Sequence, residues 1–386
     1  MYNRQLKVDQ PSAYADMRSD TVTRPTPEMI EAMMSAEVGD DVFGEDPTVN
    51  ELEETVARMT GHEAALFCTS GTLSNQVGPS LSSLLGIRTH LKQPPYSVLC
   101  DARAHILNYE ASGISFHCSA AVTGVEPKGP SGHLTAAQVE RHLILSDEVY
   151  FAPTQLICLE NTLNGSIVPL SDIKEIAALA RSKGIPFHLD GARLWNASAA
   201  TGVSIKEYCE NFDSVSLCLS KGLGAPIGSI LVGSAEFIKK ARHFRKLYGG
   251  GWRQAGMLAA ACLHAIEHHF PTMAQVHANA KRLSDSLVSL GFGLERRTET
   301  NMVWLDLSPL GATADDIARA LLRERIRVYG GEGTVMRMVL HHQISRADVE
   351  RAVAALTGFV ASLKTSRKRV REEEDGDEAA TGSNKR

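Results

Sequence analysis

The first two thirds of the chain show short apolar runs that alternate with longer segments of helical spacing. Mainly apolar runs, each followed at once by polar residues, recur at Ala64–Cys68, Ser97–Cys100, Gln155–Leu159, Pro186–Leu189 and Val215–Leu219. Between them, apolar residues recur every three or four positions, as in Val49–Met59. Buried strands produce the first pattern and amphipathic helices the second. Repeated strand–helix–strand units predict an α/β fold with a doubly wound, mostly parallel sheet.

The last third of the chain predicts a smaller α/β domain. Strand patterns at Met302–Leu307 and Met336–Leu340 alternate with helical patterns at Ala314–Glu324 and Arg346–Leu363. From Lys364 a basic block is followed by an acidic block with almost nothing apolar, which predicts disorder. We therefore divide the chain into an N-terminal arm (1–17), a large domain (18–270), a small C-terminal domain (271–363) and a disordered charged tail (364–386).

Composition narrows the class of protein. Of the 386 residues, 43% are hydrophobic and 22% are charged, as in ordinary globular proteins. The net charge of −5 does not favour nucleic acid as a partner. No apolar run reaches the roughly 20 residues that span a bilayer, so no membrane partner is predicted. The seven cysteines are widely spaced, which indicates reduced thiols in a cytoplasmic protein. The adjacent pairs His268-His269 and His341-His342 lack metal-ligand spacing, so no metal is predicted.

Polar residues that follow the predicted strands supply the candidate chemistry. The carboxyl ends of parallel strands meet at one edge of a sheet, where we expect Ser70, His105, Asp190, Arg193 and Lys221. Lys221 precedes Gly222 and Gly224, which would hold it at the mouth of the sheet. A partly desolvated lysine loses its proton more readily and can attack an aldehyde. An isolated Ser-Lys-Gly is more often a surface loop, but the convergence of the other residues favours an enzyme.

This set of residues suits pyridoxal 5'-phosphate (PLP). The pyridine nitrogen of PLP needs a carboxylate, its aldehyde needs an amine, and its phosphate needs a cradle of N–H groups. Asp190, Lys221 and the turn Ser70-Gly71-Thr72 are placed to supply these three. An amino-acid substrate also brings a carboxylate, which a guanidinium binds through two hydrogen bonds. Arg193 and Arg337 are candidates for that contact.

Six motifs occur in an order that points to one family. They are Arg18-Ser-Asp-Thr-Val-Thr-Arg-Pro, Gly39-Asp-Asp-Val-Phe-Gly-Glu-Asp-Pro, Leu159-Glu-Asn-Thr-Leu-Asn-Gly, His188-Leu-Asp-Gly-Ala-Arg, Leu219-Ser-Lys-Gly and Gly249-Gly-Gly-Trp-Arg-Gln. Together they resemble the low-specificity L-threonine aldolases, fold-type I PLP enzymes of the β-eliminating lyase group. The resemblance implies aldol cleavage of L-threonine, L-allo-threonine and similar β-hydroxy-α-amino acids to glycine and an aldehyde. It also implies a homo-oligomer, a tetramer or a dimer, with sites shared between subunits.

The same resemblance implies how PLP would be held. Lys221 would form the Schiff base, and Asp190 would pair with the pyridine nitrogen. His105 would stack on the ring, and Gly71 and Thr72 would hold the phosphate. Two basic residues of the same or a neighbouring subunit would assist at the phosphate: Lys246 and Arg253. Arg193 would contact the oxygen on the PLP ring or the substrate, and Ser19 and Arg337 would bind the substrate carboxylate.

One position departs from the family pattern. Tyr150 stands where the family usually has a histidine that handles the β-hydroxyl proton. In one interpretation Tyr150 is a packing replacement, and His105 or a water takes the proton. In the other the reaction has changed to racemisation, which needs a base on each face of the carbanion, here Lys221 and Tyr150. Some fungal relatives of the family are alanine racemases. We favour the aldolase, with an alanine racemase as the alternative. A binding protein without catalysis is less expected because Lys221 and Asp190 are both present.

Overall fold

The computed structural model describes residues 14–75, 86–92, 94–129 and 132–382, which form two compact units. One unit is Thr23–Ala274, and the other joins the described parts of Met1–Val22 and Gln275–Arg386. These limits differ from the predicted arm at 1–17 and large domain at 18–270. The described residues before Thr23 belong with the C-terminal unit because strand β1 (Ala15–Asp16) pairs in parallel with β11 (Ile326–Arg327).

A seven-stranded sheet organises the unit Thr23–Ala274, with strand order β2-β8-β7-β6-β5-β3-β4. Its strands are β2 (Ala64–Cys68), β3 (Ser97–Asp101), β4 (Ala121–Val125), β5 (Thr154–Glu160), β6 (Phe187–Gly191), β7 (Ser214–Cys218) and β8 (Ser229–Gly233). Strand β8 runs antiparallel to both β2 and β7, whereas β7, β6, β5, β3 and β4 pair in parallel. The sheet is therefore mostly parallel, as the sequence predicts.

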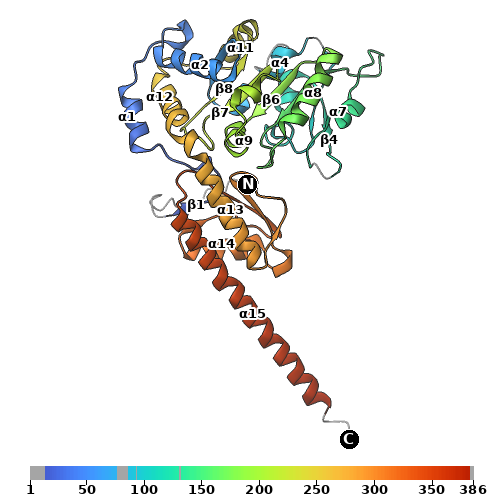
Figure 1. Cartoon of the computed structure of the whole chain (residues 1–386). Helices are drawn as coiled ribbons and strands as arrows, with labels where there is room; N and C mark the ends of the chain where they lie inside the picture. The colour runs from blue at the N-terminus through green and yellow to red at the C-terminus, as the bar shows by residue number, and fades with distance from the viewer. Residues whose placement is uncertain (1–13, 76–85, 93, 130–131, 383–386) are drawn as a thin grey trace. The chain divides into compact units, whose positions relative to one another are not determined.

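Helices lie on either side of this sheet (Figure 1). Alternate residues of β3 and β5 enter different cores: Leu99 and Ile157 join one cluster, while Val98 and Leu156 join another. This alternation explains why these two strands are mainly apolar, since both of their faces are buried. The helices of this unit are α1 (Pro27–Ser35), η2 (Asp41–Phe43), α2 (Pro47–Thr60), α3 (Gly71–Asn75), α4 (Gly86–His90), α5 (His105–Asn108), α6 (Gly113–Cys118), α7 (Ala136–His142), α8 (Leu170–Lys183), α9 (Leu194–Thr201), α10 (Ile205–Cys209), α11 (Ala235–Leu247), α12 (Gly256–His264), η3 (Ala265–His269) and η4 (Phe270–Thr272).

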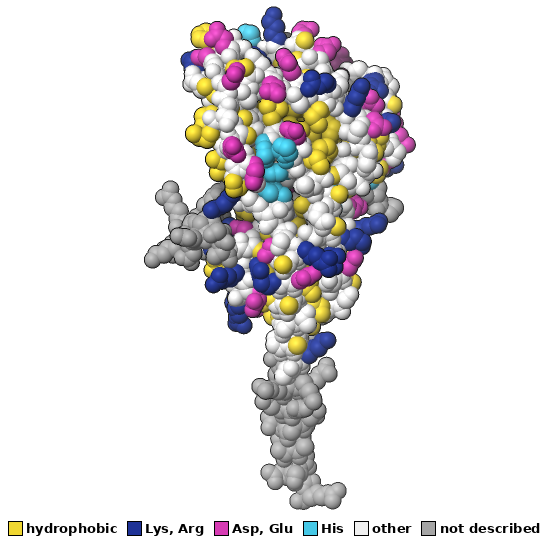
Figure 2. All heavy atoms as spheres, turned by 60° about the vertical axis from the view of Figure 1, so that its left-hand side comes forward, with side chains coloured by type: hydrophobic (Ala, Val, Ile, Leu, Met, Phe, Trp, Pro, Cys, Tyr) yellow, Lys and Arg dark blue, Asp and Glu magenta, His cyan; other side chains and the backbone are white. Residues whose placement is uncertain are grey.

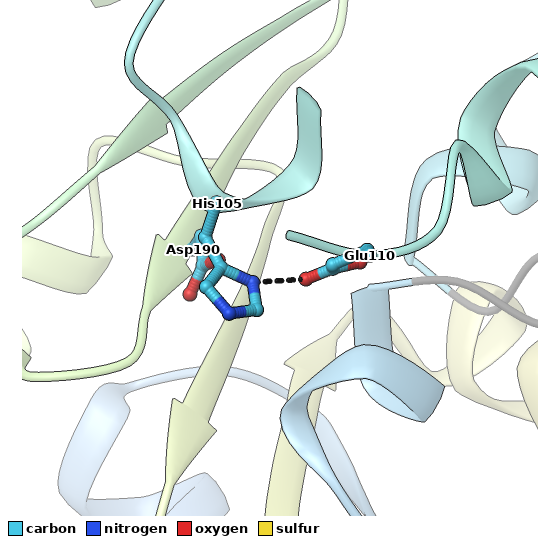
Figure 3. A group of neighbouring side chains, drawn as sticks. All are labelled: His105, Glu110 and Asp190. Carbon is cyan, nitrogen blue, oxygen red and sulfur yellow. Dashed lines mark hydrogen bonds and ion pairs between the residues drawn. The ribbon is translucent and has the colours of Figure 1, made fainter. Parts of the chain in front are cut away.

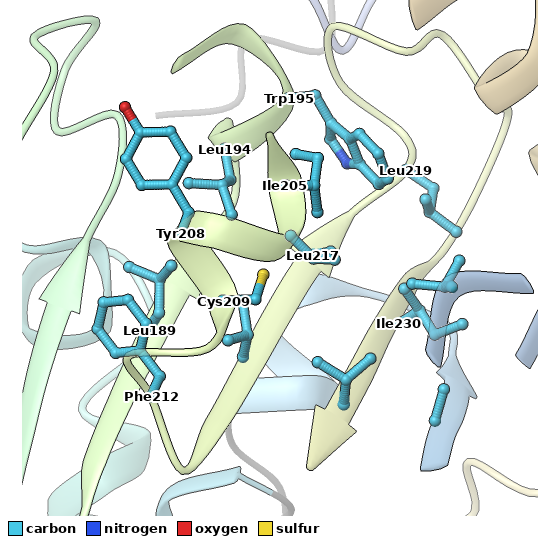
Figure 4. Close-up of a cluster of buried hydrophobic side chains, with 14 of the residues drawn as sticks. Leu189, Leu194, Trp195, Ile205, Tyr208, Cys209, Phe212, Leu217, Leu219 and Ile230 are labelled. Atoms are coloured by element: carbon cyan, nitrogen blue, oxygen red, sulfur yellow. The ribbon is translucent and has the colours of Figure 1, made fainter. Parts of the chain in front are cut away.

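The largest core packs directly behind the end of β7, the strand that leads to Lys221. Figure 4 shows Leu217 and Leu219 among the buried side chains of α9, α10 and neighbouring strands. Trp195 on α9 is 1% exposed, and its indole N–H donates to the carbonyl of Cys218 over 3.1 Å. This contact satisfies a carbonyl at the strand terminus, so the chain leaves the sheet along one defined path.

The second unit has its own core and its own small sheet. Strands β9 (Gly293–Leu294), β10 (Met302–Asp306) and β12 (Val335–Val339) form an antiparallel sheet in the order β12-β10-β9. Its remaining helices are η5 (Ser308–Leu310), α14 (Ala314–Arg323) and α15 (Arg346–Gly382), and α13 (Met273–Ser289) belongs to it for most of its length. The Thr313 hydroxyl accepts the Asp316 N–H and caps the start of α14.

Helix α15 continues beyond its predicted end. The sequence places that end at Leu363 and disorder from Lys364, whereas the structure describes helix to Gly382. Among the residues whose side chains are described, the last apolar ones packed on the core are Val360 and Leu363. Beyond them the sequence is rich in Lys, Arg, Glu and Ala, which favour helix by local propensity rather than by burial. Within the described part of the chain, no helix is both long and apolar enough to cross a membrane.

Candidate active site

The carboxyl edge of the sheet collects the ends of β5, β6 and β7. Register pairs Glu160 with Asp190 and Asp190 with Ser216, so these residues lie side by side across three strands. Lys221 follows β7, and its positive charge partly opposes the rise in pKa that burial gives Glu160 and that the Glu110 hydrogen bond gives His105, as expected for close neighbours. The sheet therefore brings Asp190, His105 and Lys221 into one region, where the sequence predicts them.

Asp190 is a buried carboxylate, 3% exposed. Its Oδ2 accepts a hydrogen bond from Asn75 Nδ2 over 2.8 Å, and its Oδ1 accepts the Ala192 N–H over 3.0 Å. Among the described residues, no lysine or arginine forms an ion pair with Asp190. A buried carboxylate without a cationic partner retains lone pairs for a positively charged group bound at this edge.

His105 lies beside Asp190 and is held by Glu110 (Figure 3). Its Nδ1–H donates to Glu110 Oε1 over 2.8 Å, and Glu110 is 4% exposed. This hydrogen bond raises the pKa of His105 above its usual value, burial opposes the rise, and the charge of Asp190 adds to it. Burial in turn raises the pKa of the Glu110 carboxyl. Glu110 therefore fixes one ring nitrogen and leaves Nε2 for chemistry.

The donor atoms of His105, Glu110 and Asp190 lie within 4.8 Å of one another, a spacing at which a metal could be held. The sequence does not predict this group. Glu110 Oε1 and Asp190 Oδ2 both accept hydrogen bonds from the amide nitrogen of Asn75, over 3.2 and 2.8 Å. These contacts link the three residues as one hydrogen-bonded network.

Glu160, at the end of β5, is another site residue that the sequence did not assign. Its Oε2 accepts the backbone N–H of His105 over 2.7 Å. Burial, and then the nearby charge of Asp190, raise the pKa of Glu160 to about 8. Its position directly after an apolar strand is a signal that could have identified it. Asn75 and Glu110 lie away from strand ends and offer no comparable signal.

The loop that carries Lys221 is tied down at several points. The carbonyl of Lys221 accepts the Gly224 N–H over 2.7 Å, and Leu219 N–H donates to the carbonyl of Gly228 over 3.0 Å. Gly228 has φ of +106°, and a Cβ there would lie 2.5 Å from the Phe67 ring, so a side chain does not fit. Such a loop restricts where the Lys221 amine can point.

One member of a histidine cluster at the end of α12 and in η3 supports the same loop. Figure 2 shows histidine side chains gathered on one face of the molecule. The ring centres of His264 and His268 are 4.4 Å apart, and those of His264 and His269 are 5.6 Å apart. His269 Nδ1–H donates to the carbonyl of Leu223 over 2.7 Å. This bond anchors the loop two residues after Lys221.

The predicted phosphate cradle follows β2. Ser70 Oγ accepts the Leu73 N–H over 3.0 Å, so this hydroxyl is used within the turn. A Cβ on Gly71 would lie 3.5 Å from Ser229 Oγ. That hydroxyl is buried and has no hydrogen-bond partner among the described residues. An unsatisfied donor beside Gly71 fits a bound acceptor such as a phosphate oxygen. Thr72 is exposed.

The other predicted residues are distributed more widely. Lys246 on α11 is exposed, and Arg253, with 56% of its side chain exposed, forms an ion pair with Asp40 over 2.7 Å. Neither makes a hydrogen bond or ion pair to Asp190, His105 or Lys221 in the part of the chain described. Arg193 begins α9 beside Asp190, and its N–H donates to the carbonyl of Asn161 over 3.4 Å.

Ser19 and Arg337 belong to the second unit. Ser19 is 9% exposed, and its hydroxyl accepts a hydrogen bond from Thr21 Oγ1 over 2.8 Å. Arg337 lies on β12 with its guanidinium 5.6 Å from the Trp304 ring centre. A hydrogen bond of 2.9 Å from Val339 N–H to the carbonyl of Met17 joins their two segments.

Tyr150 is 87% exposed within its chain. No hydrogen bond joins its phenol to Lys221 among the described contacts. Its phenol is therefore largely open to solvent within its own chain.

Comparison with known proteins identifies the class. A solved threonine aldolase from Leishmania major superposes with a TM-score of 0.75, covering 90% of this chain and 99% of that one. At 18% identity this likeness concerns the fold alone. The predicted fold class, a fold-type I α/β protein, is confirmed.

The family follows from sequence comparison. The model of the family described as "Beta-eliminating lyase" matches residues 16–309. A "Probable low-specificity L-threonine aldolase" of Schizosaccharomyces pombe is 47% identical over 350 residues, 89% of this chain and 91% of the relative. "Alanine racemase TOXG" of Cochliobolus carbonum is 37% identical over 347 residues, 88% of this chain and 86% of the relative. The chain belongs to the beta-eliminating lyase family, which confirms the family and the lyase class predicted from its sequence.

Proposed function

We propose that this protein binds PLP at Asp190 and Lys221 and cleaves L-threonine or L-allo-threonine to glycine and acetaldehyde. The observation that carries the proposal is the buried carboxylate of Asp190, which has no cationic partner among the described residues and lies at the same edge as Lys221. A protonated pyridine nitrogen is a suitable partner for such a carboxylate. The threonine aldolase name of the S. pombe relative supports the choice of substrate.

The residues present fit the cofactor. Lys221 would hold its aldehyde group and Asp190 its ring nitrogen, while Gly71, Thr72 and the unsatisfied Ser229 hydroxyl would face its phosphate. Bound in this way, PLP supplies an electron sink for the pair of electrons left on the substrate α-carbon. Lys246 and Arg253 are exposed on their own chain, so we assign them to the phosphate of a neighbouring copy in a homo-oligomer.

We assign His105 as the base that takes the proton from the β-hydroxyl group of the substrate. Its Nδ1–H is engaged by Glu110, so the neutral ring has its lone pair on Nε2. As His105 accepts the hydroxyl proton, the Cα–Cβ bond breaks and the aldehyde leaves. The α-carbon then takes a proton to complete glycine. Ser19, Arg193 and Arg337 would bind the substrate carboxylate, because guanidinium and hydroxyl groups donate to it.

The racemase alternative is tested by the same preparation. The exposed position of Tyr150 favours the aldolase, whereas the 37% identical racemase keeps the alternative worth measuring. The purified protein is incubated separately with L-threonine, L-allo-threonine and L-alanine, and glycine, acetaldehyde and D-alanine are assayed. Glycine with acetaldehyde supports the proposal. D-alanine without glycine overturns it.

Asp190→Ala tests the site itself. The loss of the buried charge should lower turnover by orders of magnitude and weaken PLP binding, with a smaller loss for Asp190→Glu. The seven cysteines carry no disulfide, which is consistent with the cytoplasmic location that we propose.

A further inference from the structure

Behind Asp190, a continuous line of hydrogen bonds crosses the interior of the sheet. Asp190 Oδ2 lies 2.8 Å from Asn75 Nδ2, and Asn75 Oδ1 lies 3.3 Å from His188 Nε2. His188 Nδ1 lies 2.7 Å from Ser214 Oγ, which in turn lies 2.7 Å from His90 Nε2. The line starts on α4 and ends at the carboxylate assigned to the cofactor.

Which atom donates and which accepts in each of these hydrogen bonds can be worked out from the carboxylate of Asp190, because an ionised carboxylate only accepts. Asn75 Nδ2 faces the carboxylate oxygens of Asp190 and Glu110, over 2.8 and 3.2 Å. The reversed amide would place its oxygen against both of these acceptors and lose both bonds. The Asn75 oxygen therefore faces His188, and the His188 proton resides on Nε2.

His188 is neutral, and its neutral form decides which atoms donate and which accept in the remaining hydrogen bonds of the line. His188 is 0% exposed, and burial lowers its pKa to about 3. Its Nδ1 consequently carries a lone pair and accepts a hydrogen bond from the Ser214 hydroxyl. A hydroxyl has one proton to donate, so the Ser214 oxygen must accept the Nε2–H of His90. Burial also lowers the pKa of His90, to about 4, so this ring is neutral as well.

We propose that His188 and His90 are positioning residues that hold Asn75 with its N–H groups toward Asp190, and so keep that carboxylate aimed at the PLP ring nitrogen. Every donor in the line points the same way, so the bond dipoles add at Asp190. A hydrogen bond donated to a carboxylate favours its charged form. This inference rests on the proposed function, because it takes Asp190 as the partner of PLP.

Loss of His188 has a specific consequence in this scheme. His188→Leu leaves Asn75 Oδ1 buried without a donor, so the amide rotates to find one and no longer serves Asp190. His188→Gln places an N–H within similar reach and should restore the contact. If His188 only filled space, neither the rescue by His188→Gln nor a coupling between His188 and Asn75 would be expected.

The test measures PLP binding and ring protonation in the full-length protein. The dissociation constant of PLP is obtained by absorbance titration, and the ring nitrogen is observed by ¹⁵N NMR with ¹⁵N-labelled PLP. His188→Leu should weaken PLP by at least about tenfold, the worth of a hydrogen bond to a charged group, and move the ¹⁵N signal toward the unprotonated form. His188→Gln should stay near wild type in both measurements. In an Asn75→Ala background, His188→Leu should add little further loss.

A milder variant keeps the test decisive if His188→Leu does not fold. Ser214→Ala removes one hydroxyl and should produce a smaller change of the same sign in both measurements. Two controls remove a hydrogen-bonded group of the same kind elsewhere. They are His62→Leu, at a partly buried ring whose Nε2 contacts the carbonyl of Phe212, and Ser198→Ala, whose hydroxyl donates to the carbonyl of Val203. Both controls should retain wild-type PLP affinity and the wild-type ¹⁵N signal.

The two proposals fail in different ways. Wild-type protein that binds no PLP overturns the proposed function. Wild-type protein that binds PLP with a protonated ring nitrogen, together with unchanged affinity and signal in His188→Leu and Ser214→Ala, overturns the role of the hydrogen-bonded line alone. Equal losses in His188→Leu and His188→Gln would also overturn it.

Discussion

Glu110 Oε1 lies 2.8 Å from Nδ1 of His105, and this pair sets the protonation of the histidine that we assign to the β-hydroxyl proton. The hydrogen bond to Glu110 raises the pKa of His105 because it favours the imidazolium, as does the charge of Asp190. The protein thus places the ring where its charge depends on a buried carboxylate rather than on solvent.

Glu110→Gln should shift the acidic limb of the activity profile. Without the carboxylate charge the pKa of His105 falls, so the neutral ring persists to lower pH and the limb of kcat moves to lower pH. The measurement is kcat against pH for both proteins. Glu140→Gln, at an exposed residue that pairs with Lys183, is the control. An unchanged limb would show that His105 does not set this protonation step.

Lys221→Ala should fold but lose the visible absorbance of bound PLP and essentially all turnover. The reason is that the variant removes the amine that holds the cofactor aldehyde. Lys183→Ala removes a lysine that pairs with Glu140 on the surface and should behave as wild type. The comparison needs absorbance spectra, circular dichroism and an assay for glycine. A Lys221→Ala protein that retains both colour and activity would remove the centre of the proposed site.

Tyr150→His should leave threonine cleavage equal to wild type or faster. It restores the histidine of the family pattern, and a phenol of pKa about 10 is a poor base at neutral pH. Initial rates with L-threonine and L-allo-threonine are compared with those of Tyr150→Phe. If Tyr150→Phe abolishes D-alanine formation from L-alanine in a protein that otherwise forms it, the racemase interpretation replaces the aldolase.

Acid should destabilise the fold partly through its buried histidines. The lowered pKa values of His188, about 3, and His90, about 4, mean that the unfolded chain binds protons there first. Their contribution to stability is present above the ordinary histidine pKa of 6.5 and is lost as pH falls toward those values. Urea midpoints are measured at several pH values for wild type and His188→Gln. The variant should have a shallower slope, by up to about 1.4 kcal/mol per pH unit. Identical slopes would contradict a neutral buried His188.

A chain that stops at Leu363 should keep its melting temperature and activity. Of the side chains that the structure describes, Val360 and Leu363 are the last apolar ones packed on the second core. The sequence that follows is almost entirely charged or small, so we expect it to contribute little apolar burial. Leu356, at 0% exposure, is the contrast: Leu356→Ala should cost about 2–5 kcal/mol. Thermal melts of the three proteins make the comparison. A loss of several degrees on truncation would show that the tail docks on the protein.

The sequence alone predicted five of the seven strands of the large sheet and the two groups at the centre of the proposed site. Apolar runs marked β2, β3, β5, β6 and β7 because both faces of a parallel sheet are buried, a property that each strand records locally. Asp190 and Lys221 followed from the same pattern, since the carboxyl end of a parallel strand has a known edge. Tyr150 was visible as a departure only through the family motif.

The tertiary structure alone decided which residues support that site. Asn75 meets Asp190 across 115 positions of sequence and His188 across 113, so no local pattern could pair them. Strand β1 joins the C-terminal unit for the same reason, because its partner β11 lies more than 300 residues away. Hydrogen bonds of this kind depend on strand order and side-chain packing, which are settled only when the distant segments come together. They fix the position of the Asp190 carboxylate, and the bond to Glu110 raises the pKa of His105.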